Sequence, residues 1–165
     1  LQYQLGKRAV LAVLPTGGGK TVCFSYIAQA AARKGNRVCI LVHRQELLDQ
    51  ASRSLSGMGV PHGIIAAGRG MDLSHAVQVA SVGTLSRRLH LLPRDFFQLL
   101  VVDEAHHTTA KSWDACIQHF FFSFFISSKN STILNKHKLL IVIIIVNALK
   151  LAFSRNVTKL ALHVL

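Results

Sequence analysis

Two short stretches of this chain carry residue types that bind phosphate groups and divalent cations. The first is Pro15-Thr16-Gly17-Gly18-Gly19-Lys20-Thr21, which lies between an apolar run and a segment of helical character. Glycines let the backbone curl so that several N–H groups point at phosphate oxygens, and a following helix N-terminus adds partial positive charge. We expect this loop to hold a nucleotide's phosphates, with Lys20 reaching the β- and γ-phosphates and the Thr21 hydroxyl binding Mg²⁺. The alternative is a glycine-rich turn that binds nothing.

The second stretch is acidic, Asp103-Glu104-Ala105-His106, and it follows the apolar run Leu99–Val102. Paired carboxylates at the end of a buried strand are costly unless a cation or another partner meets them. We expect Asp103 to hold Mg²⁺, directly or through water, and Glu104 to orient and deprotonate an attacking water. The pair His106-His107 could suggest a metal site, but no third ligand follows at suitable spacing, which argues against zinc.

The segments around these motifs predict alternating strands and helices. Short apolar runs bounded by Gly, Pro or Asn are typical of buried parallel strands, and the segments between them carry helical patterns. The pattern predicts an α/β fold, a parallel sheet with helices on both faces, and both motifs at carboxyl ends of strands, where such sheets bind ligands. The predicted strands are Ala9–Leu14, Val38–Val42, Ile64–Ala67, Val77–Ser81 and Leu99–Val102, and the predicted helices are Lys20–Ala32 and Gln45–Leu55.

The bulk composition points to a polyanionic partner. The chain has 165 residues and a formal net charge of +12, which favours nucleic acid or an anionic membrane surface. Its three cysteines form no CxxC pair, so we expect neither a disulfide framework nor a zinc site. This cysteine usage instead indicates a reducing intracellular setting. The N-terminus carries no signal-peptide pattern and no initiator Met, so we expect a fragment.

The chain changes character after Cys116. All 11 glycines, all three prolines and all seven acidic residues lie in residues 1–116, whereas residues 117–165 carry six of the 19 Lys and Arg. Because compact folds need turn residues, we expect residues 117–165 to be a hydrophobic tail outside the domain, as a frameshift or intron read-through would produce. The apolar run Leu139–Val146 is too short for a membrane helix, which needs roughly 20 residues. A longer window, Ile133–Phe153, contains several Lys and Asn residues, which argues against a membrane span.

The two boxes together resemble superfamily 2 helicases of the DEAD/DEAH group. The loop is similar to the family's PTGxGKT form, although Leu14 stands where the strict P-loop pattern has Gly. Val42–Gln50 resembles motif Ia, with His43 in place of Pro, and Ala80–Leu85 resembles a later motif that touches the nucleic-acid backbone. The resemblance covers about residues 5–116. Within it, Val60–Gly68 and Asp103–His107 are similar to bacterial and phage-type repair or restriction-like helicases. It implies an incomplete P-loop NTPase domain of the RecA-like type.

The resemblance also implies roles for individual residues. His106 would couple the nucleotide site to a second motor domain. Arg44, Thr84, Arg87 and Arg88 would contact sugar and phosphate, which positions a strand without reading its sequence. The alternatives are a charge at a helix start for Arg44 and a solvated helix face for Arg87 and Arg88.

Several expected parts of such a helicase are absent from the sequence. We find no Gln motif before the loop, no Ser-Ala-Thr motif after the acidic box, and no second RecA-like domain with its arginine finger. The resulting hypothesis is the ATP- and Mg²⁺-binding part of a helicase or translocase that binds a DNA or RNA backbone, with DNA favoured over RNA. We expect it to be cytoplasmic or nucleoid-associated and nearly inactive alone. The rivals are a non-catalytic ATP- or nucleic-acid-binding fragment and a membrane-associated protein anchored by Phe120–Phe153.

Overall fold

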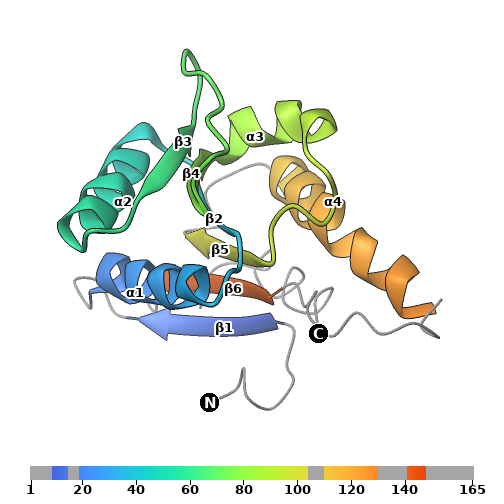
Figure 1. The fold of residues 1–165 in the computed structure, drawn as a ribbon, viewed down its shortest axis with the longest axis horizontal. Helices are drawn as coiled ribbons and strands as arrows, with labels where there is room; N and C mark the ends of the chain where they lie inside the picture. The colour runs from blue at the N-terminus through green and yellow to red at the C-terminus, as the bar shows by residue number, and fades with distance from the viewer. Residues whose placement is uncertain (1–8, 15–18, 104–109, 130–140, 148–165) are drawn as a thin grey trace.

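The computed structural model describes residues 9–14, 19–103, 110–129 and 141–147. Strands and helices alternate along most of this length, as Figure 1 shows. The elements in chain order are β1 (Ala9–Leu14), α1 (Lys20–Arg33), β2 (Val38–Val42), α2 (Gln45–Gly57), β3 (His62–Ile65), β4 (Val77–Ser81), α3 (Val82–Arg88), the 3₁₀ helix η2 (Leu89–Leu91), β5 (Leu99–Asp103), α4 (Ala110–Lys129) and β6 (Ile141–Asn147).

The strands form one six-stranded sheet in the order β1-β6-β5-β2-β4-β3, and every pairing is parallel. Because the strands are parallel, their carboxyl ends share one edge of the sheet. Leu14 at the end of β1 pairs with Asn147 of β6, and Asp103 at the end of β5 pairs with Ile145 of β6. The two motif-bearing strands therefore flank β6.

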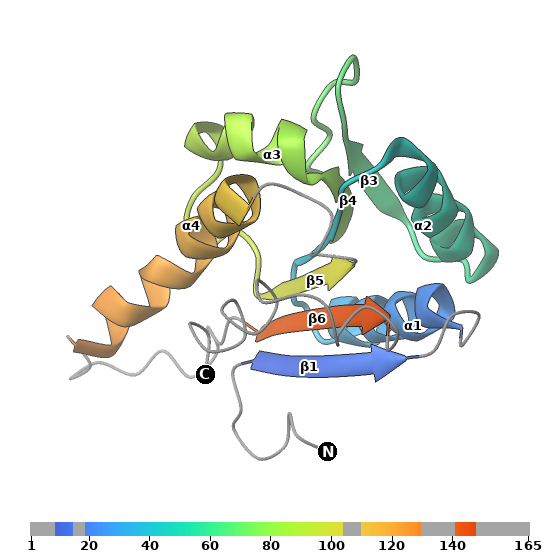
Figure 2. The same ribbon diagram turned by 180° about the vertical axis from the view of Figure 1, so that it is seen from behind.

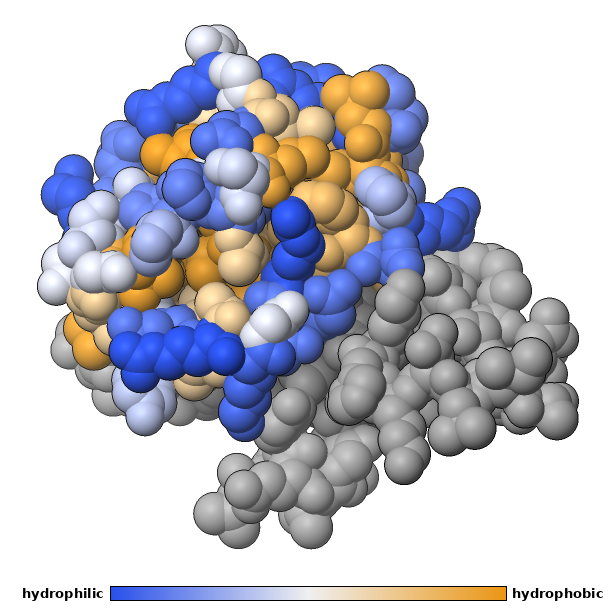
Figure 3. All heavy atoms as spheres, viewed as in Figure 1, coloured by the Kyte–Doolittle hydropathy of each residue, from blue (hydrophilic) through white to orange (hydrophobic). Residues whose placement is uncertain are grey.

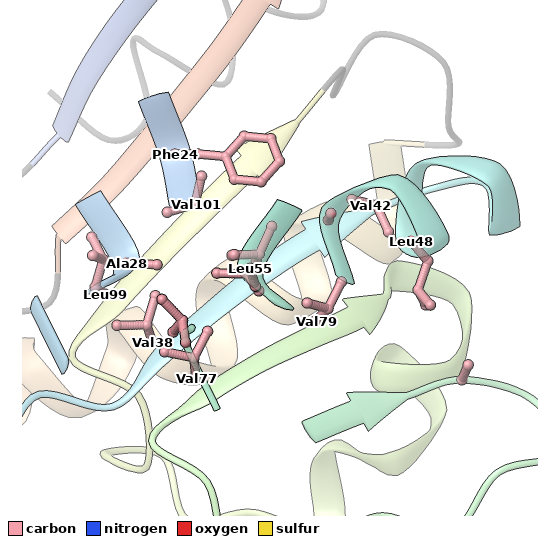
Figure 4. Packing of buried hydrophobic residues seen from close by; sticks show 14 residues of the cluster. Phe24, Ala28, Val38, Val42, Leu48, Leu55, Val77, Val79, Leu99 and Val101 are labelled. Carbon is pink, nitrogen blue, oxygen red and sulfur yellow. The ribbon is translucent and has the colours of Figure 1, made fainter. Parts of the chain in front are cut away.

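Both faces of the sheet are buried, and the alternation of side chains along β2 shows how. Cys39 and Leu41 belong to a core cluster that also contains Trp113 and Phe120 of α4 and residues of α3. Val38, Ile40 and Val42 belong to a second cluster with residues of α1 and α2, shown in Figure 4. Figures 1 and 2 show α1 and α2 on one side of the sheet and α3 and α4 on the other. Burial on both faces explains why the strands are continuous apolar runs.

The predicted fold class is confirmed, and most predicted elements lie where the sequence put them. Strands β1, β2 and β4 have the predicted bounds, and β5 extends by one residue to Asp103. Helices α1 and α2 begin as predicted and extend past Ala32 and Leu55 respectively. Strand β3 begins two residues earlier than predicted, because His62 and Gly63 pair with Val77 and Gln78 of β4.

The region after the acidic box differs from the sequence expectation. The predicted boundary after Cys116 falls inside α4, whose residues Trp113, Cys116 and Phe120 are all buried in one cluster. Residues 117–165 were expected to lie outside the domain, yet Ile141–Asn147 add a strand, β6, to the sheet. Most of the run Leu139–Val146 is thus a strand between two parallel neighbours, an environment that a short continuous apolar run suits.

The described residues contain no helix that is both long and apolar enough to cross a membrane. Figure 3 shows apolar and polar side chains interspersed over the face seen in Figure 1. The large hydrophobic side chains exposed in the described part are Val22, Tyr26 and Leu91.

One glycine in β3 is required by close packing. Gly63 faces Gln78, whose amide nitrogen donates to the carbonyl oxygens of Asp72 and His75, each at 3.0 Å. A Cβ at position 63 would lie 2.5 Å from the Asp72 carbonyl oxygen and would clash with the Gln78 amide.

We predict that Gly63→Ala lowers the free energy of unfolding by about 1–3 kcal/mol, measured by denaturant unfolding. Gly57→Ala, where a Cβ meets nothing within 4 Å, is the control. Equal stabilities would contradict the packing described.

A second prediction concerns β6, with which β1 pairs along its whole length. Proline at Ile144 removes a backbone N–H from the middle of this central strand, a position at which β-sheets do not accept proline. We expect Ile144→Pro to lower the thermal midpoint and weaken nucleotide binding, because β1 leads into the phosphate loop. Ile144→Val, which keeps the N–H, should behave as wild type. Unchanged stability and binding in the proline variant would instead support the expectation that residues 117–165 contribute nothing.

Candidate nucleotide site and nucleic-acid surface

The start of α1 has the geometry of an anion site. Gly19 precedes the helix with a φ of 69° and a ψ of 25°, in the left-handed region that favours glycine. It has no side chain with which to cap the helix, so the N–H groups of the first turn, which lack intrahelical acceptors, remain for an external anion. Lys20 and Thr21 follow at once, and both are half-buried. Thr16, Gly17 and Gly18 lie outside the described residues.

Asp103 is the last residue of β5 and is 7% exposed. A carboxylate buried to this degree requires compensating charge or hydrogen bonds. It ends a strand at the same edge of the sheet as Leu14, the residue before the predicted phosphate loop in the sequence, with β6 between them. Such an arrangement can place a cation-binding carboxylate across from phosphate-binding N–H groups. Glu104 and His106, the other predicted members of the acidic box, lie outside the described residues.

Helices α1 and α2 are joined by three polar contacts along their length. The Gln50 amide nitrogen donates to the Thr21 hydroxyl oxygen at 3.2 Å, close to the start of α1. Ser25 donates to Ser54 at 3.0 Å, and the Gln29 amide donates to the Met58 carbonyl at 3.3 Å. Sequence reasoning placed Gln50 at the end of a motif but gave it no role. Its contact with Thr21 depends on how two helices pack, which no local pattern announces.

The candidate nucleic-acid residues lie beyond the carboxyl ends of β2 and β4, which are neighbours in the sheet. Arg44 precedes α2 in an extended conformation and is exposed. Arg87, in the last turn of α3, is exposed as well, whereas Thr84 is only 4% exposed. The structure therefore leaves the Thr84 side chain little surface for contact with a strand.

Arg69, which the sequence analysis did not single out, lies beside Arg88. The Arg88 guanidinium donates to the carbonyl oxygen of Arg69 at 3.2 Å, which brings the turn at Gly68–Gly70 against α3. Arg69 is exposed. The Gly-Arg-Gly turn was the available signal, since a charge between two glycines in a loop is well placed to reach a ligand.

Among the described residues, no group of three or more His, Cys, Asp or Glu side chains could hold a metal ion. Asp103 and Thr21, the two predicted Mg²⁺ ligands, carry oxygen atoms, the ligand type that Mg²⁺ prefers. The pair His106-His107, which sequence reasoning discounted as a zinc site, lies outside the described residues.

The buried cysteines are poor candidates for thiolate chemistry. Burial, followed by the charge of the nearby Cys116, raises the pKa of the Cys39 thiol well above its usual value. Burial also raises the pKa of Cys116, to about 12. Both thiols are therefore protonated at neutral pH. Because the reactive form of cysteine is the thiolate, neither is a candidate nucleophile.

Comparison with known proteins places this sequence in a family. Residues 1–146 match the family described as "Type III restriction enzyme, res subunit". A protein of Saccharomyces cerevisiae named as an ATP-dependent helicase, IRC3, is 38% identical over 125 residues, covering 70% of this chain and 18% of the relative. The Schizosaccharomyces pombe protein named as a mitochondrial ATP-dependent helicase, irc3, is 36% identical over 126 residues, covering 72% of this chain and 20% of the relative.

Among solved structures, the UvsW helicase from bacteriophage T4 superposes with a TM-score of 0.65 at 16% identity, covering 93% of this chain and 51% of that one. This likeness supports the fold. The chain spans about a fifth of the length of the curated relatives it matches. Because the family match runs through nearly the whole chain, the chain belongs to the family of the type III restriction enzyme res subunit, and its predicted membership of the superfamily 2 helicases is confirmed.

Proposed function

We propose that this chain is the ATP-binding part of an ATP-dependent helicase or translocase that acts on nucleic acid. One observation carries the proposal. The helix start at Gly19–Thr21 and the buried carboxylate of Asp103 lie at the same edge of a parallel sheet, with β6 between their strands. Open α/β sheets bind ligands at this edge. The names of the curated relatives support ATP-dependent helicase activity for the whole protein.

Different residues of the proposed nucleotide site bind the phosphates, hold Mg²⁺ and activate water. Backbone N–H groups of the loop, with Lys20, hold the phosphates, and Lys20 neutralises their charge. The Thr21 hydroxyl and the Asp103 carboxylate are the Mg²⁺ ligands, and bound Mg²⁺ offsets negative charge on the nucleotide. Glu104 orients the attacking water and accepts its proton, and His106 couples the site to a second RecA-like domain. The loop residues concerned are Thr16, Gly17, Gly18 and Gly19.

The proposed nucleic-acid surface consists of Arg44, Arg87 and Arg88, with Arg69 added from the structure. Arg44, Arg87 and Arg88 lie past the ends of β2 and β4, and Arg69, which follows β3, joins them through its contact with Arg88. The formal net charge of +12 supports a polyanionic partner. We favour DNA over RNA, since the family description names a restriction enzyme. Thr84 has a structural role in this proposal, because it is buried in α3. We further propose an intracellular location, cytoplasmic or associated with the nucleoid, where ATP and nucleic acid are both present.

The nucleotide site is tested by Lys20→Ala. The change removes the cation proposed to meet the phosphates, so we expect the affinity for a fluorescent ATP analogue to fall at least tenfold in the presence of Mg²⁺. Lys34→Ala, at the far end of the same helix and exposed, is the matched control and should bind as wild type. Fluorescence titration of the three proteins gives the affinities. Equal affinities for wild type and Lys20→Ala would refute the phosphate-loop assignment.

The nucleic-acid surface is tested by the salt dependence of binding. Each phosphate contact adds about one unit to the slope of log affinity against log salt, so Arg44→Ala and Arg87→Ala should each reduce that slope by about one. The loss should be similar for oligonucleotides of unrelated sequence, since backbone contacts read no bases. Arg53→Ala, on an exposed part of α2, is the control. Fluorescence anisotropy with single-stranded DNA and RNA of one sequence measures the slopes and the DNA preference. Slopes that match wild type would remove these arginines from the proposal.

A further inference from the structure

Thr21 has a partner on the neighbouring helix. Its hydroxyl oxygen accepts a hydrogen bond from the Gln50 amide at 3.2 Å, in an exposed position at the α1–α2 junction. The two residues are 29 positions apart in sequence, so the contact is made by tertiary packing. Gln50 is the last residue of the motif Ia stretch, and nothing in the proposed chemistry has yet used it.

The donor type of Gln50 suits a hydroxyl that must bind a cation. A hydroxyl oxygen has two lone pairs and one hydrogen. A neutral N–H donor engages one lone pair and fixes the rotation of the side chain, which leaves the second lone pair for Mg²⁺ and the hydrogen for a phosphate or carboxylate oxygen. An acceptor in the same place would compete for the hydrogen, and a cationic donor would repel Mg²⁺. The amide nitrogen therefore orders the Thr21 hydroxyl without opposing the ion.

Helix α2 also spans the distance between the two proposed binding surfaces. It begins immediately after Arg44 and carries Gln50 less than two turns further on. Its packing on α1 is maintained elsewhere by Ser25–Ser54 and Gln29–Met58, which do not involve the nucleotide edge. Several contacts thus hold the two helices together, whereas Gln50 is the residue of α2 that contacts Thr21.

We propose that Gln50 is a positioning residue that orients the Thr21 hydroxyl for Mg²⁺ from across the α1–α2 junction. The inference rests on the proposed function, because it assumes that Thr21 is a Mg²⁺ ligand. It assigns to Gln50 an effect on the Mg²⁺ dependence of nucleotide binding that is separate from any effect on fold stability.

The test is a MgCl₂ titration of the full chain at a fixed concentration of a fluorescent ATP analogue. Gln50→Leu keeps size and helix propensity but removes the donor. We expect the Mg²⁺ concentration for half-maximal binding to rise roughly 2- to 10-fold, the range of one net hydrogen bond, while affinity in EDTA is unchanged. Gln50→Ala should give the same shift.

Two further proteins separate positioning from helix packing. Gln29→Leu removes the other glutamine donor of the α1–α2 junction, at 3.3 Å from the Met58 carbonyl, and should leave the Mg²⁺ midpoint unchanged. In a Thr21→Val background, Gln50→Leu should produce no additional shift, because the group it positions is gone. Thermal midpoints of all variants report any general loss of stability.

The outcomes distinguish this inference from the function on which it rests. A wild-type protein that binds the analogue without any Mg²⁺ dependence would overturn the metal role of Thr21 and the inference with it. A Mg²⁺-dependent wild type with an unshifted Gln50→Leu variant would overturn the inference alone. Equal shifts for Gln29→Leu and Gln50→Leu, or a shift that persists in the Thr21→Val background, would do the same.

Discussion

The pairing of β6 with both β1 and β5 sets the distance across the candidate nucleotide site. Neighbouring strands lie about 4.8 Å apart, so β1 and β5 are separated by about 10 Å at the edge where the phosphate loop and Asp103 emerge. That spacing suits a phosphate chain with a cation on one side. The pairing also fixes height, because Leu14 and Asp103 lie two register positions apart along β6. The spacing and the height of these two strand ends are therefore set by the backbone hydrogen bonds of the sheet.

Helix packing supplies what the sheet cannot. The alternation along β2 buries one set of side chains against α1 and α2 and the other against α3 and α4. The first pair of helices, whose packing on the sheet Figure 4 shows, carries Lys20, Thr21 and Gln50 of the proposed nucleotide site. The second pair presents Arg87 and braces β5 through Trp113. The α1–α2 face carries the proposed nucleotide contacts together with Arg44, the α3–α4 face carries Arg87, and both faces pack on the same central strands.

Local pattern was sufficient where composition and structure agree. The buried runs gave β1, β2 and β4 their bounds, and Lys20, Thr21 and Asp103 stand at the element ends predicted for them. Helix α3 was not predicted, because Val82, Gly83 and Thr84 are weak helix formers and tertiary packing overrides their preference. The absence of Gly and Pro after Cys116 argued against further structure, but a helix of 20 residues and a single strand need few turns. The Gln50 contact and the burial of Thr84 depend on packing between helices, which sequence spacing does not encode.

The two buried thiols make opening of the core measurable. Cys39 on β2 and Cys116 on α4 face one cluster from opposite sides, and both are fully buried, whereas Cys23 on α1 is exposed. Because both sulfurs are buried, a thiol reagent reaches them only when the protein opens locally, whereas it reaches the exposed Cys23 in the native state. The lag between labelling of Cys23 and labelling of the two buried thiols, followed by mass spectrometry, measures how often this part of the core opens under native conditions. The protein carries that probe and its internal reference without any substitution.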